Sequence, residues 1–147
     1  MKIHEISENK KQHLDLLLLA DEQESMIDRY LERGAMYVLE DNGVQGVCVV
    51  TDEGEGVLEV KNIAIRPEAQ KRGYGKAMLN FVADTYQGRF HTLLVGTGDS
   101  PLTVPFYEKC GFTYSHRIEN FFSDHYDHPI FECGVQLTDM VYLEKAL

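Results

Sequence analysis

The residues whose types and spacing most clearly indicate chemistry form one short segment, Gln70-Lys71-Arg72-Gly73-Tyr74-Gly75-Lys76. It follows a hydrophobic stretch that ends at Ile65 and precedes a stretch with helical periodicity. A glycine-containing loop that opens into a helix presents unpaired backbone N–H groups and the positive end of the helix dipole, and both attract phosphate. Without a Cβ, Gly73 and Gly75 can adopt positive φ and let phosphate groups approach the main chain. Two glycines one residue apart also occur in ordinary strand-to-helix turns, so the surrounding residues must show whether this segment is a phosphate site or only a turn.

Charge is distributed unevenly along the chain, and its only basic stretch coincides with this segment. The protein has 14 Lys and Arg and 24 Asp and Glu residues, for a net charge of −10. Residues 61–91 carry 6 basic and 2 acidic residues, residues 1–60 carry 5 and 14, and residues 92–147 carry 3 and 8. The basic residues at the centre of the segment, Lys71, Arg72 and Lys76, could either bind an anionic ligand or simply form a solvated, charged start of the helix. A local basic patch on an acidic body suits a small polyphosphate ligand, whereas nucleic acid would need a broad basic face.

Length and composition favour one globular domain. The 147 residues are 44% hydrophobic, and no linker or repeat divides them, so we expect residues 1–147 to form one domain around one core. The longest aliphatic run, Leu16 to Ala20, is too short to span a bilayer, and the polar start lacks the apolar segment of a signal peptide. These features predict a cytoplasmic protein with no membrane partner. Cys48, Cys110 and Cys133 are odd in number and widely spaced, which suggests neither a disulfide framework nor a zinc site.

The periodicity of the chain predicts a mixed α/β fold. Strands are expected at 2–6, 36–39, 44–50, 57–65, 92–95, 112–118 and 140–143, with a hairpin turn at Asn42-Gly43. Helices are expected at 10–20, 25–33, 73–86 and 104–110. In the third of these helices we expect a buried stripe formed by Met78, Phe81, Val82 and Thr85.

The strand that ends at Ile65 changes phase along its length. Leu58 and Val60 share one parity, whereas Ile63 and Ile65 share the other, so the apolar face changes near Lys61. One extra residue, a β-bulge, would explain the change and would leave nearby backbone groups unpaired. A strand buried on both faces would give the same pattern without a bulge, and the pattern alone does not separate the two.

Two motifs together resemble the GNAT superfamily of N-acetyltransferases. The family's turn for the pyrophosphate of acetyl-CoA, Gln/Arg-x-x-Gly-x-Gly/Ala, is matched by Gln70 to Gly75, and its Tyr-Glu-Lys-x-Gly-Phe signature is matched by Tyr107 to Phe112. The resemblance covers about Val44 to Ile118, and the tail from Asn120 resembles that of a bacterial subgroup. It implies a twisted, mostly antiparallel sheet of six to seven strands flanked by about four helices, with splayed central strands that form the acetyl-CoA cleft.

The resemblance also implies how acetyl-CoA would be held, with no metal involved. The turn that begins at Gln70 would hold the pyrophosphate through main-chain N–H groups, and the side chain of Lys71 or Arg72 would reach the 3′-phosphate. By this resemblance, the amides that would face the pyrophosphate are those of Arg72, Gly73, Tyr74, Gly75 and Lys76.

The pantetheine arm would pair with the strand before the turn. Ile63 and Ile65 would bind it through backbone groups, as an added strand binds a sheet edge. Family members often have an Asn seven residues before the tyrosine, and this chain has Ser100 there, whose hydroxyl would do part of the same work. Pro105 requires the helix that contains Tyr107 to begin near residue 103, where the missing N–H does no harm.

Acetyl transfer to an amine sets three chemical tasks, and the family pattern assigns a group to each. An amine with a pKa of about 10.4 is mostly ammonium at neutral pH, so a carboxylate must take its proton directly or through water, and Glu59 is placed to do so. A backbone N–H near Ala64 or Ile65 would polarise the thioester carbonyl. Tyr107 would donate its phenolic proton to the departing thiolate. The alternatives are a solvated strand residue for Glu59 and a core residue for Tyr107.

These assignments lead to two hypotheses about function. The first is an acetyl-CoA-dependent N-acetyltransferase, in which a small-molecule or peptide amine attacks the thioester directly in a ternary complex. The alternative is a non-catalytic module that binds or senses acyl-CoA, and the presence of Glu59 and Tyr107 favours the enzyme. A nucleotide-phosphate binder is disfavoured because no Gly-Lys-Ser/Thr follows the glycines.

Three other groups of residues give weaker signals. His125 and His128, with Asp124 and Asp127, carry side chains that would suit a divalent metal. They lie in an aromatic loop without a convincing complete ligand set, which favours solvated loop residues. Cys110 has no base nearby in the sequence and is expected to be a buried structural thiol. An aromatic cluster would line the acceptor site, form a homodimer contact or simply pack, and the sequence does not separate these roles. The cluster comprises Phe121, Phe122, Tyr126 and Phe131.

Overall fold

A computed structural model describes the whole chain, Met1–Leu147. Its strands are β1 (Lys2–Ile6), β2 (Ala35–Glu40), β3 (Val44–Asp52), β4 (Val57–Ile65), β5 (Thr92–Gly98), β6 (Thr113–Ile118), β7 (Phe131–Glu132), β8 (Val135–Gln136) and β9 (Met140–Ala146). Its helices are α1 (Leu14–Ala20), α2 (Glu24–Ile27), α3 (Tyr74–Tyr86), α4 (Thr103–Lys109) and α5 (Phe121–His125), with 3₁₀ turns at Lys10–His13 and Pro67–Ala69.

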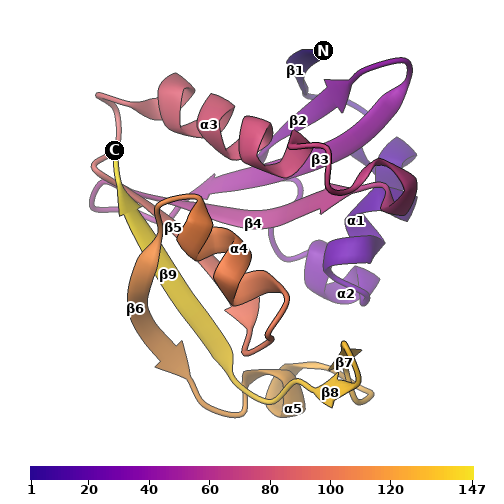
Figure 1. Ribbon diagram of the computed structural model, residues 1–147, viewed down its shortest axis with the longest axis vertical. Helices are drawn as coiled ribbons and strands as arrows, with labels where there is room; N and C mark the ends of the chain where they lie inside the picture. Colours follow the sequence, from indigo (N-terminus) through magenta and orange to yellow (C-terminus); the bar gives the residue numbers. More distant parts are fainter.

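Seven strands form one sheet in the order β1-β2-β3-β4-β5-β9-β6, and β7 and β8 form a separate hairpin. Only β4 and β5 pair in parallel, whereas every other neighbouring pair in the sheet is antiparallel. In Figure 1 β3 and β4 pass under α3, and β9 and β6 diverge from them on the far side of β5. The predicted fold class, a mostly antiparallel twisted sheet with flanking helices, is confirmed.

The two faces of the first strands bury two separate hydrophobic clusters. Along β2, Tyr37 and Leu39 point into the cluster beneath α3, whereas Met36 and Val38 point into the cluster beneath α1 and α2. This alternation is the period of two expected for a strand, and here both faces are covered. The sheet is therefore the middle layer between α3 on one face and α1 with α2 on the other.

Of the two explanations that the sequence left open for the phase change in β4, the β-bulge is present. Val50 of β3 pairs with Val60, and the next β3 residue in the ladder, Val49, pairs with Asn62, so that Lys61 is the extra residue. The bulge keeps Val60 and Ile63 on the same side, packed with the α3 cluster, although their parities differ. It also turns Asn62 toward α1, where its side chain donates a hydrogen bond to the carbonyl of Leu17.

The two central strands separate beyond the bulge. The parallel pairing of β4 with β5 runs only from Val57 opposite Thr92 to Val60 opposite Val95. The remainder of β4 stays paired with β3, and the remainder of β5 stays paired with β9. This separation opens a cleft in the sheet, as expected for splayed central strands.

The N-terminal helices are shorter than predicted. The expected helix at 10–20 is a 3₁₀ turn followed by α1, and the expected helix at 25–33 ends at Ile27. Beyond Ile27 the chain continues in turns, in which the N–H groups of Arg29 and Tyr30 bond to carbonyls three residues back. The buried ammonium of Lys10 holds the end of this segment. It donates to the carbonyls of Leu31, Glu32 and Gly34 at 2.9, 3.4 and 2.7 Å.

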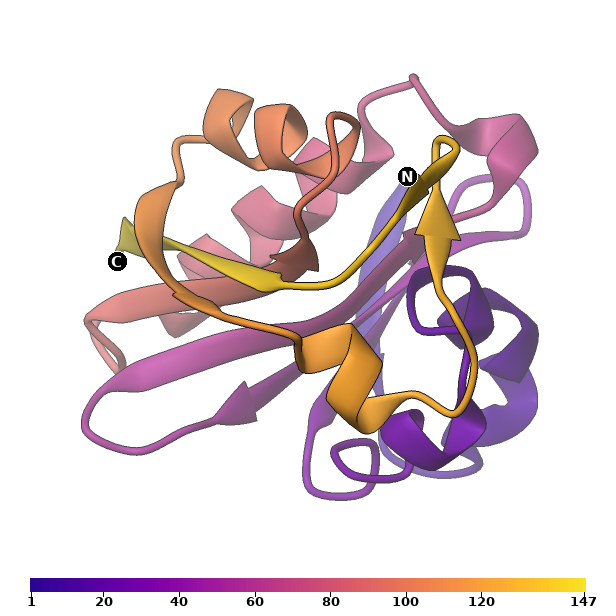
Figure 2. The same ribbon diagram turned by 90° about the horizontal axis from the view of Figure 1, so that it is seen from below.

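The predicted stripe of α3 is correct at Met78 and Val82 but wrong at Thr85. Thr85 is exposed and bonds back to the Phe81 carbonyl, whereas Tyr86 occupies the buried position. The sequence also gave no sign of α5 or of the β7–β8 hairpin. Figure 2 shows this C-terminal segment crossing the lower side of the molecule toward α1 and α2. No helix in the structure is both long and apolar enough to cross a membrane.

Candidate active site

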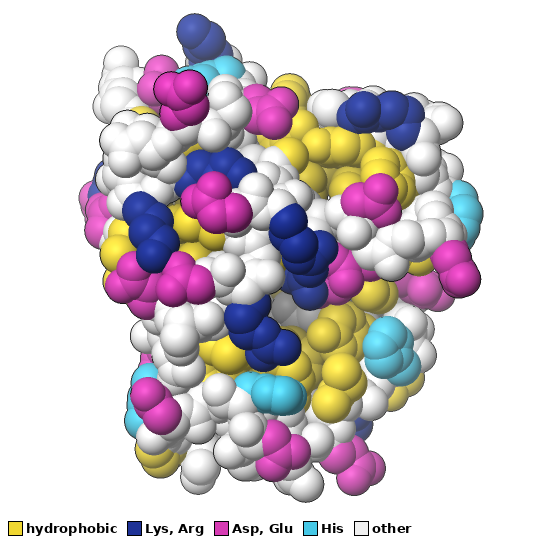
Figure 3. Space-filling model, turned by 180° about the vertical axis from the view of Figure 1, so that it is seen from behind, with side chains coloured by type: hydrophobic (Ala, Val, Ile, Leu, Met, Phe, Trp, Pro, Cys, Tyr) yellow, Lys and Arg dark blue, Asp and Glu magenta, His cyan; other side chains and the backbone are white.

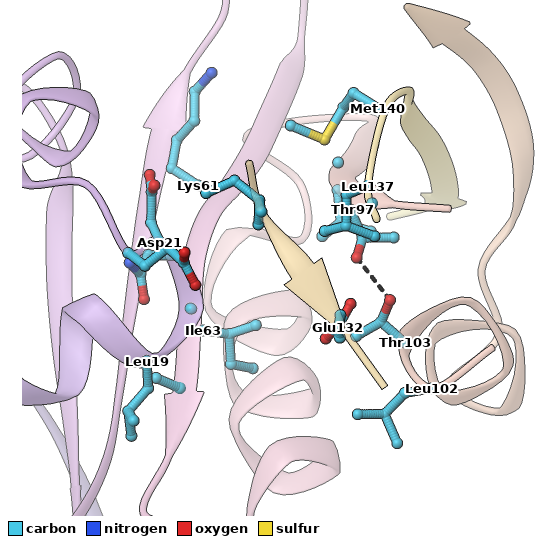
Figure 4. Close-up of a pocket in the computed structure, with 18 of the residues that line it drawn as sticks. Leu19, Asp21, Lys61, Ile63, Thr97, Leu102, Thr103, Glu132, Leu137 and Met140 are labelled. Carbon is cyan, nitrogen blue, oxygen red and sulfur yellow. Dashed lines mark hydrogen bonds between the residues drawn. The ribbon is translucent and has the colours of Figure 1, made fainter. Parts of the chain in front are cut away.

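The cleft between the separated strands has a volume of about 380 Å³. One wall is formed by β4 from Val60 to Ile65 and the other by β5 from Val95 to Gly98. The segment after α1, the start of α4 and the C-terminal segment complete the lining. Figure 4 shows side chains from these elements converging on the same space. The volume lies in the range of ordinary small-molecule sites.

The β4 wall offers backbone groups to a ligand. Beyond Val60 this strand pairs with β3 alone, so its edge toward β5 has no strand partner. Ile63, Ala64 and Ile65 all line the cleft along this edge. Gln70 lies in the same lining, and its side-chain amide donates to the Ile65 carbonyl at 3.1 Å. An extended ligand chain could therefore add to this edge as a strand would.

The glycine turn has the geometry of an anion site. Gly73 is the residue immediately before α3 and has φ +84°, in the left-handed region that favours glycine. The first intrahelical bond runs from the Ala77 N–H to the Gly73 carbonyl at 3.0 Å, so the preceding amides of the turn make no helical bonds. Lys71, Arg72 and Lys76 are exposed here, and none forms an ion pair in the structure.

The two glycines of the turn serve different purposes. Gly75 lies in the first turn of α3, and only Gly73 of the two adopts positive φ. A Cβ on Gly75 would lie 3.0 Å from Cζ of Phe106 in α4. Glycine at this position therefore allows the Phe106 ring of α4 to approach α3 closely, and this contact places the signature helix beside the glycine turn.

Tyr107 projects from α4 into the lining of the cleft. Pro105 lies in the first turn of α4, which begins at Thr103 as predicted. The Tyr107 ring packs edge-on against Phe106 and Phe112, and the side chain is buried. Burial raises the pKa of Tyr107 well above its usual range. The phenol therefore keeps its proton at neutral pH and can donate it to a group in the cleft.

Glu59 lies just before the bulge and is buried. Its carboxylate pairs with Lys61 Nζ at 3.1 Å, and Lys61 lines the cleft whereas Glu59 does not. Burial raises the pKa of Glu59, and the neighbouring Lys61 partly offsets that rise. The Glu59 carboxyl group thus lies outside the cleft lining, in contact with a lysine that belongs to it.

The structure does not bring Ser100 into the cleft. Its hydroxyl accepts a hydrogen bond from the Leu102 N–H at 3.1 Å, in the turn that leads into α4, and it is absent from the lining. Two threonines that the motif comparison missed lie there instead. Thr97 of β5 and Thr103 of α4 place their hydroxyl oxygens 2.7 Å apart within the lining (Figure 4).

The largest omission of the sequence analysis is Asp21. It lines the cleft and accepts hydrogen bonds from the hydroxyls of Tyr30 at 3.1 Å and Tyr126 at 2.7 Å. The second of these partners lies 105 residues away in the sequence. No local spacing signals such a contact, because only the crossing of the C-terminal segment over α2 creates it.

The tail residues divide between the cleft and the surface. Phe122, Tyr126 and Phe131 line the cleft, whereas Phe121 packs edge-on against Phe122 outside it. His128 is paired with Asp127 and with Glu22 of the segment after α1. No group of three or more His, Cys, Asp and Glu residues has an arrangement that would hold a metal ion. Cys110 is buried and burial raises its pKa, as expected for a structural thiol.

A sheet that splits between its two parallel strands, with a glycine turn and a tyrosine helix at the split, defines a GNAT-type acetyltransferase. Residues 32–114 match the Acetyltransferase (GNAT) domain family. The chain is also 39% identical to the uncharacterized N-acetyltransferase YvbK of Bacillus subtilis over 132 residues, which cover 88% of this chain and 85% of that protein. The chain therefore belongs to the GNAT family of N-acetyltransferases.

Solved structures agree with this assignment over nearly the whole chain. A GNAT family acetyltransferase of Elizabethkingia anophelis with acetyl-CoA bound has a TM-score of 0.94 and 34% identity, covering 99% of this chain and 97% of that one. The IAA acetyltransferase of Bacillus cereus has a TM-score of 0.92 and 36% identity, covering 99% of both chains. A Bacillus subtilis acetyltransferase in complex with CoA has a TM-score of 0.89 and 36% identity, covering 99% and 98%.

Proposed function

We propose that this enzyme transfers the acetyl group of acetyl-CoA to a primary amine by direct attack in the cleft. The observation that carries the proposal is the junction at which the unpaired edge of β4 leads into the turn at Gly73. The edge suits the pantetheine arm and the turn suits the pyrophosphate. The similar proteins of Elizabethkingia anophelis and Bacillus subtilis were solved with acetyl-CoA and CoA bound.

The reaction requires each proton to have a donor and an acceptor. In our proposal Glu59 takes a proton from the ammonium form of the acceptor through water, which frees the nitrogen to attack the thioester carbon. A backbone N–H near Ala64 stabilises the developing oxyanion. As the C–N bond forms and the C–S bond breaks, Tyr107 protonates the thiolate. The nitrogen's remaining extra proton then returns to the Tyr107 phenolate.

Direct attack is supported by the chemistry of the cleft lining. It contains no Cys, Ser or His side chain. Its two threonine hydroxyls, of Thr97 and Thr103, bond to each other rather than to a base, and its one lysine, Lys61, is paired with Glu59. None of these groups therefore has the adjacent base or free amine of an activated nucleophile. Cys48 of β3, in the hydrophobic cluster that also contains Tyr107, is fully buried, and burial raises the pKa of its thiol to about 12. A thiol that is protonated and inaccessible does not accept an acetyl group.

Two measurements on the purified protein test this function. Acetyl-CoA is expected to raise the melting temperature in a concentration-dependent manner. Adding primary amines should then release free CoA thiol in step with the formation of acetylated amine. Binding of acetyl-CoA without thiol release across polyamines, arylalkylamines, aminoglycosides, amino acids and peptides would favour the non-catalytic acyl-CoA-binding module instead.

A further inference from the structure

The end of the cleft opposite α3 is lined by carboxylates that the proposed acetyl-transfer chemistry does not use. They are Asp21 and Glu22 after α1 and Glu132 in β7. Figure 4 shows Asp21 and Glu132 on opposite sides of the space, with Ile63 between them. Acidic side chains alone do not define a site, but two further features of this region point to a ligand.

The first feature is the way in which Asp21 is held. The hydroxyl of Tyr30 donates to Oδ2 and the hydroxyl of Tyr126 donates to Oδ1, at 3.1 and 2.7 Å. One hydrogen bond to each oxygen fixes the carboxylate and leaves further lone pairs for a ligand. Asp21 forms no ion pair with any Lys or Arg, although it is half-buried. A carboxylate in such a place favours a cation.

The second feature is an unpaired acceptor on the same wall. Asn62 lines the cleft and is 3% exposed. Its Nδ2 donates to the Leu17 carbonyl at 3.0 Å and to the Tyr30 hydroxyl at 3.1 Å. Because a carbonyl can only accept, this contact fixes the orientation of the amide. The buried Oδ1 then has no hydrogen-bond partner in the protein, and an N–H group of a ligand would satisfy it.

The remainder of this region is apolar, and its one cation is already neutralised. Phe122, Tyr126 and Phe131 line it together with aliphatic side chains. Lys61 is the only Lys or Arg in the lining, and its Nζ pairs with Glu59 at 3.1 Å. Figure 3 shows the hollow on the back of the molecule, with Lys and Arg side chains on one side of it and hydrophobic side chains beside it. No free cation in the lining is available for a carboxylate on the ligand.

We propose that the acceptor is a primary amine on an apolar body that carries no carboxylate, and that Asp21 binds its ammonium group. The aromatic side chains pack against the apolar body, and Asn62 Oδ1 accepts a hydrogen bond from the same nitrogen. This inference rests on the proposed acetyltransferase function and specifies its second substrate. Asp21 acts in binding, before the nitrogen gives up its proton to Glu59.

A matched pair of acceptors tests the charge selectivity. Phenethylamine and phenylalanine share an aromatic body and a primary amine, and only phenylalanine has a carboxylate. With saturating acetyl-CoA, kcat/KM from thiol release should be at least about tenfold higher for phenethylamine, which corresponds to about 1.4 kcal/mol. Equal or higher kcat/KM for phenylalanine would overturn the inference.

A second test changes the proposed binding group. Asp21→Asn should raise KM for phenethylamine about tenfold or more while leaving KM for acetyl-CoA unchanged. Asp28→Asn makes the same chemical change at an exposed residue paired with Lys11, outside the cleft lining, and should leave both constants unchanged. Retained stabilisation by acetyl-CoA shows that the Asp21→Asn protein is folded. An unchanged KM for phenethylamine in that folded protein would contradict the assignment of Asp21.

The outcomes also separate this inference from the function on which it rests. Loss of acetyl-CoA binding in the unaltered protein would refute the proposed function itself. If acetyl-CoA binds but phenethylamine neither reacts nor binds to the CoA complex by calorimetry, the acceptor inference is wrong and the cofactor site stands.

Discussion

Tyr107 is the residue whose role depends most clearly on its surroundings. It lies in the cleft lining, and burial keeps its phenol protonated. Tyr107→Phe should therefore lower kcat by about 10²-fold, the lower end of the usual effect of a general acid, and leave acetyl-CoA binding nearly unchanged. Thiol release and thermal shift measure the two effects separately. Tyr114→Phe, at a side chain that is 59% exposed, is the control. Parallel losses of binding and turnover would make Tyr107 a structural residue.

Glu59 gives a prediction about pH. Burial raises its pKa despite the opposing effect of Lys61, and a base must be ionised to accept a proton. Wild-type kcat/KM should therefore fall as the pH drops through this raised pKa. Glu59→Gln should lower kcat/KM and abolish its fall at low pH. Glu144→Gln, at an exposed position on β9, should retain the wild-type fall. An unchanged profile in Glu59→Gln would exclude Glu59 as the base.

At the scale of an element, the turn before α3 is the most testable feature. A Cβ on Gly73 would meet nothing within 4 Å, so alanine there brings only the strain of φ +84°, about 1 to 2 kcal/mol. Gly88 is the matched control, because it has φ +87° and equally open surroundings. Both Gly73→Ala and Gly88→Ala should lower stability similarly. Only Gly73→Ala should weaken stabilisation by acetyl-CoA, and equal ligand responses would refute the pyrophosphate assignment.

The sequence predicted the elements whose information is local. The phase change between Val60 and Ile63 suggested a bulge near Lys61 as one of two explanations, because side-chain parity records one inserted residue, and the pairing of β3 with β4 shows that residue. The end of α2 could not be predicted in this way. The pattern of residues 28–33 is that of a helix, whereas the structure has turns there. Lys10, 21 residues before Leu31, bonds to the carbonyl of Leu31 at the end of this segment, a contact that no local pattern indicates.

The same distinction holds within the candidate site. The glycine turn and Tyr107 belong to compact motifs, so their positions were readable from spacing. Asp21 was missed because its partner Tyr126 belongs to the C-terminal segment, whose crossing toward α2 no local pattern indicates. Ser100 was misplaced because a motif offset gives sequence position and not the direction of a hydroxyl, which is turned to the Leu102 amide.

At the scale of the whole molecule, the charge pattern predicts a salt effect. The chain carries a net charge of −10, yet Lys71 and Arg72 lie exposed and without ion-pair partners beside the proposed pyrophosphate site. The dissociation constant for acetyl-CoA should rise with ionic strength, because exposed charges are screened over about 10 Å at 0.1 M salt. Arg72→Ala should weaken binding at low salt and reduce this dependence, as measured by calorimetry at several salt concentrations. Lys2→Ala, at an exposed position on β1, should change neither, and identical salt slopes for all three proteins would contradict the assignment.

The most direct test of the central claim, direct acetyl transfer within the cleft, is a single-turnover experiment with the protein in excess over acetyl-CoA. Without amine, the account predicts no released thiol and no acetylated protein by intact mass spectrometry. Addition of phenethylamine or another reactive amine should then release one CoA for each acetylated amine formed. Acetylated protein that forms before the amine is added and then passes its acetyl group to the amine would contradict the account.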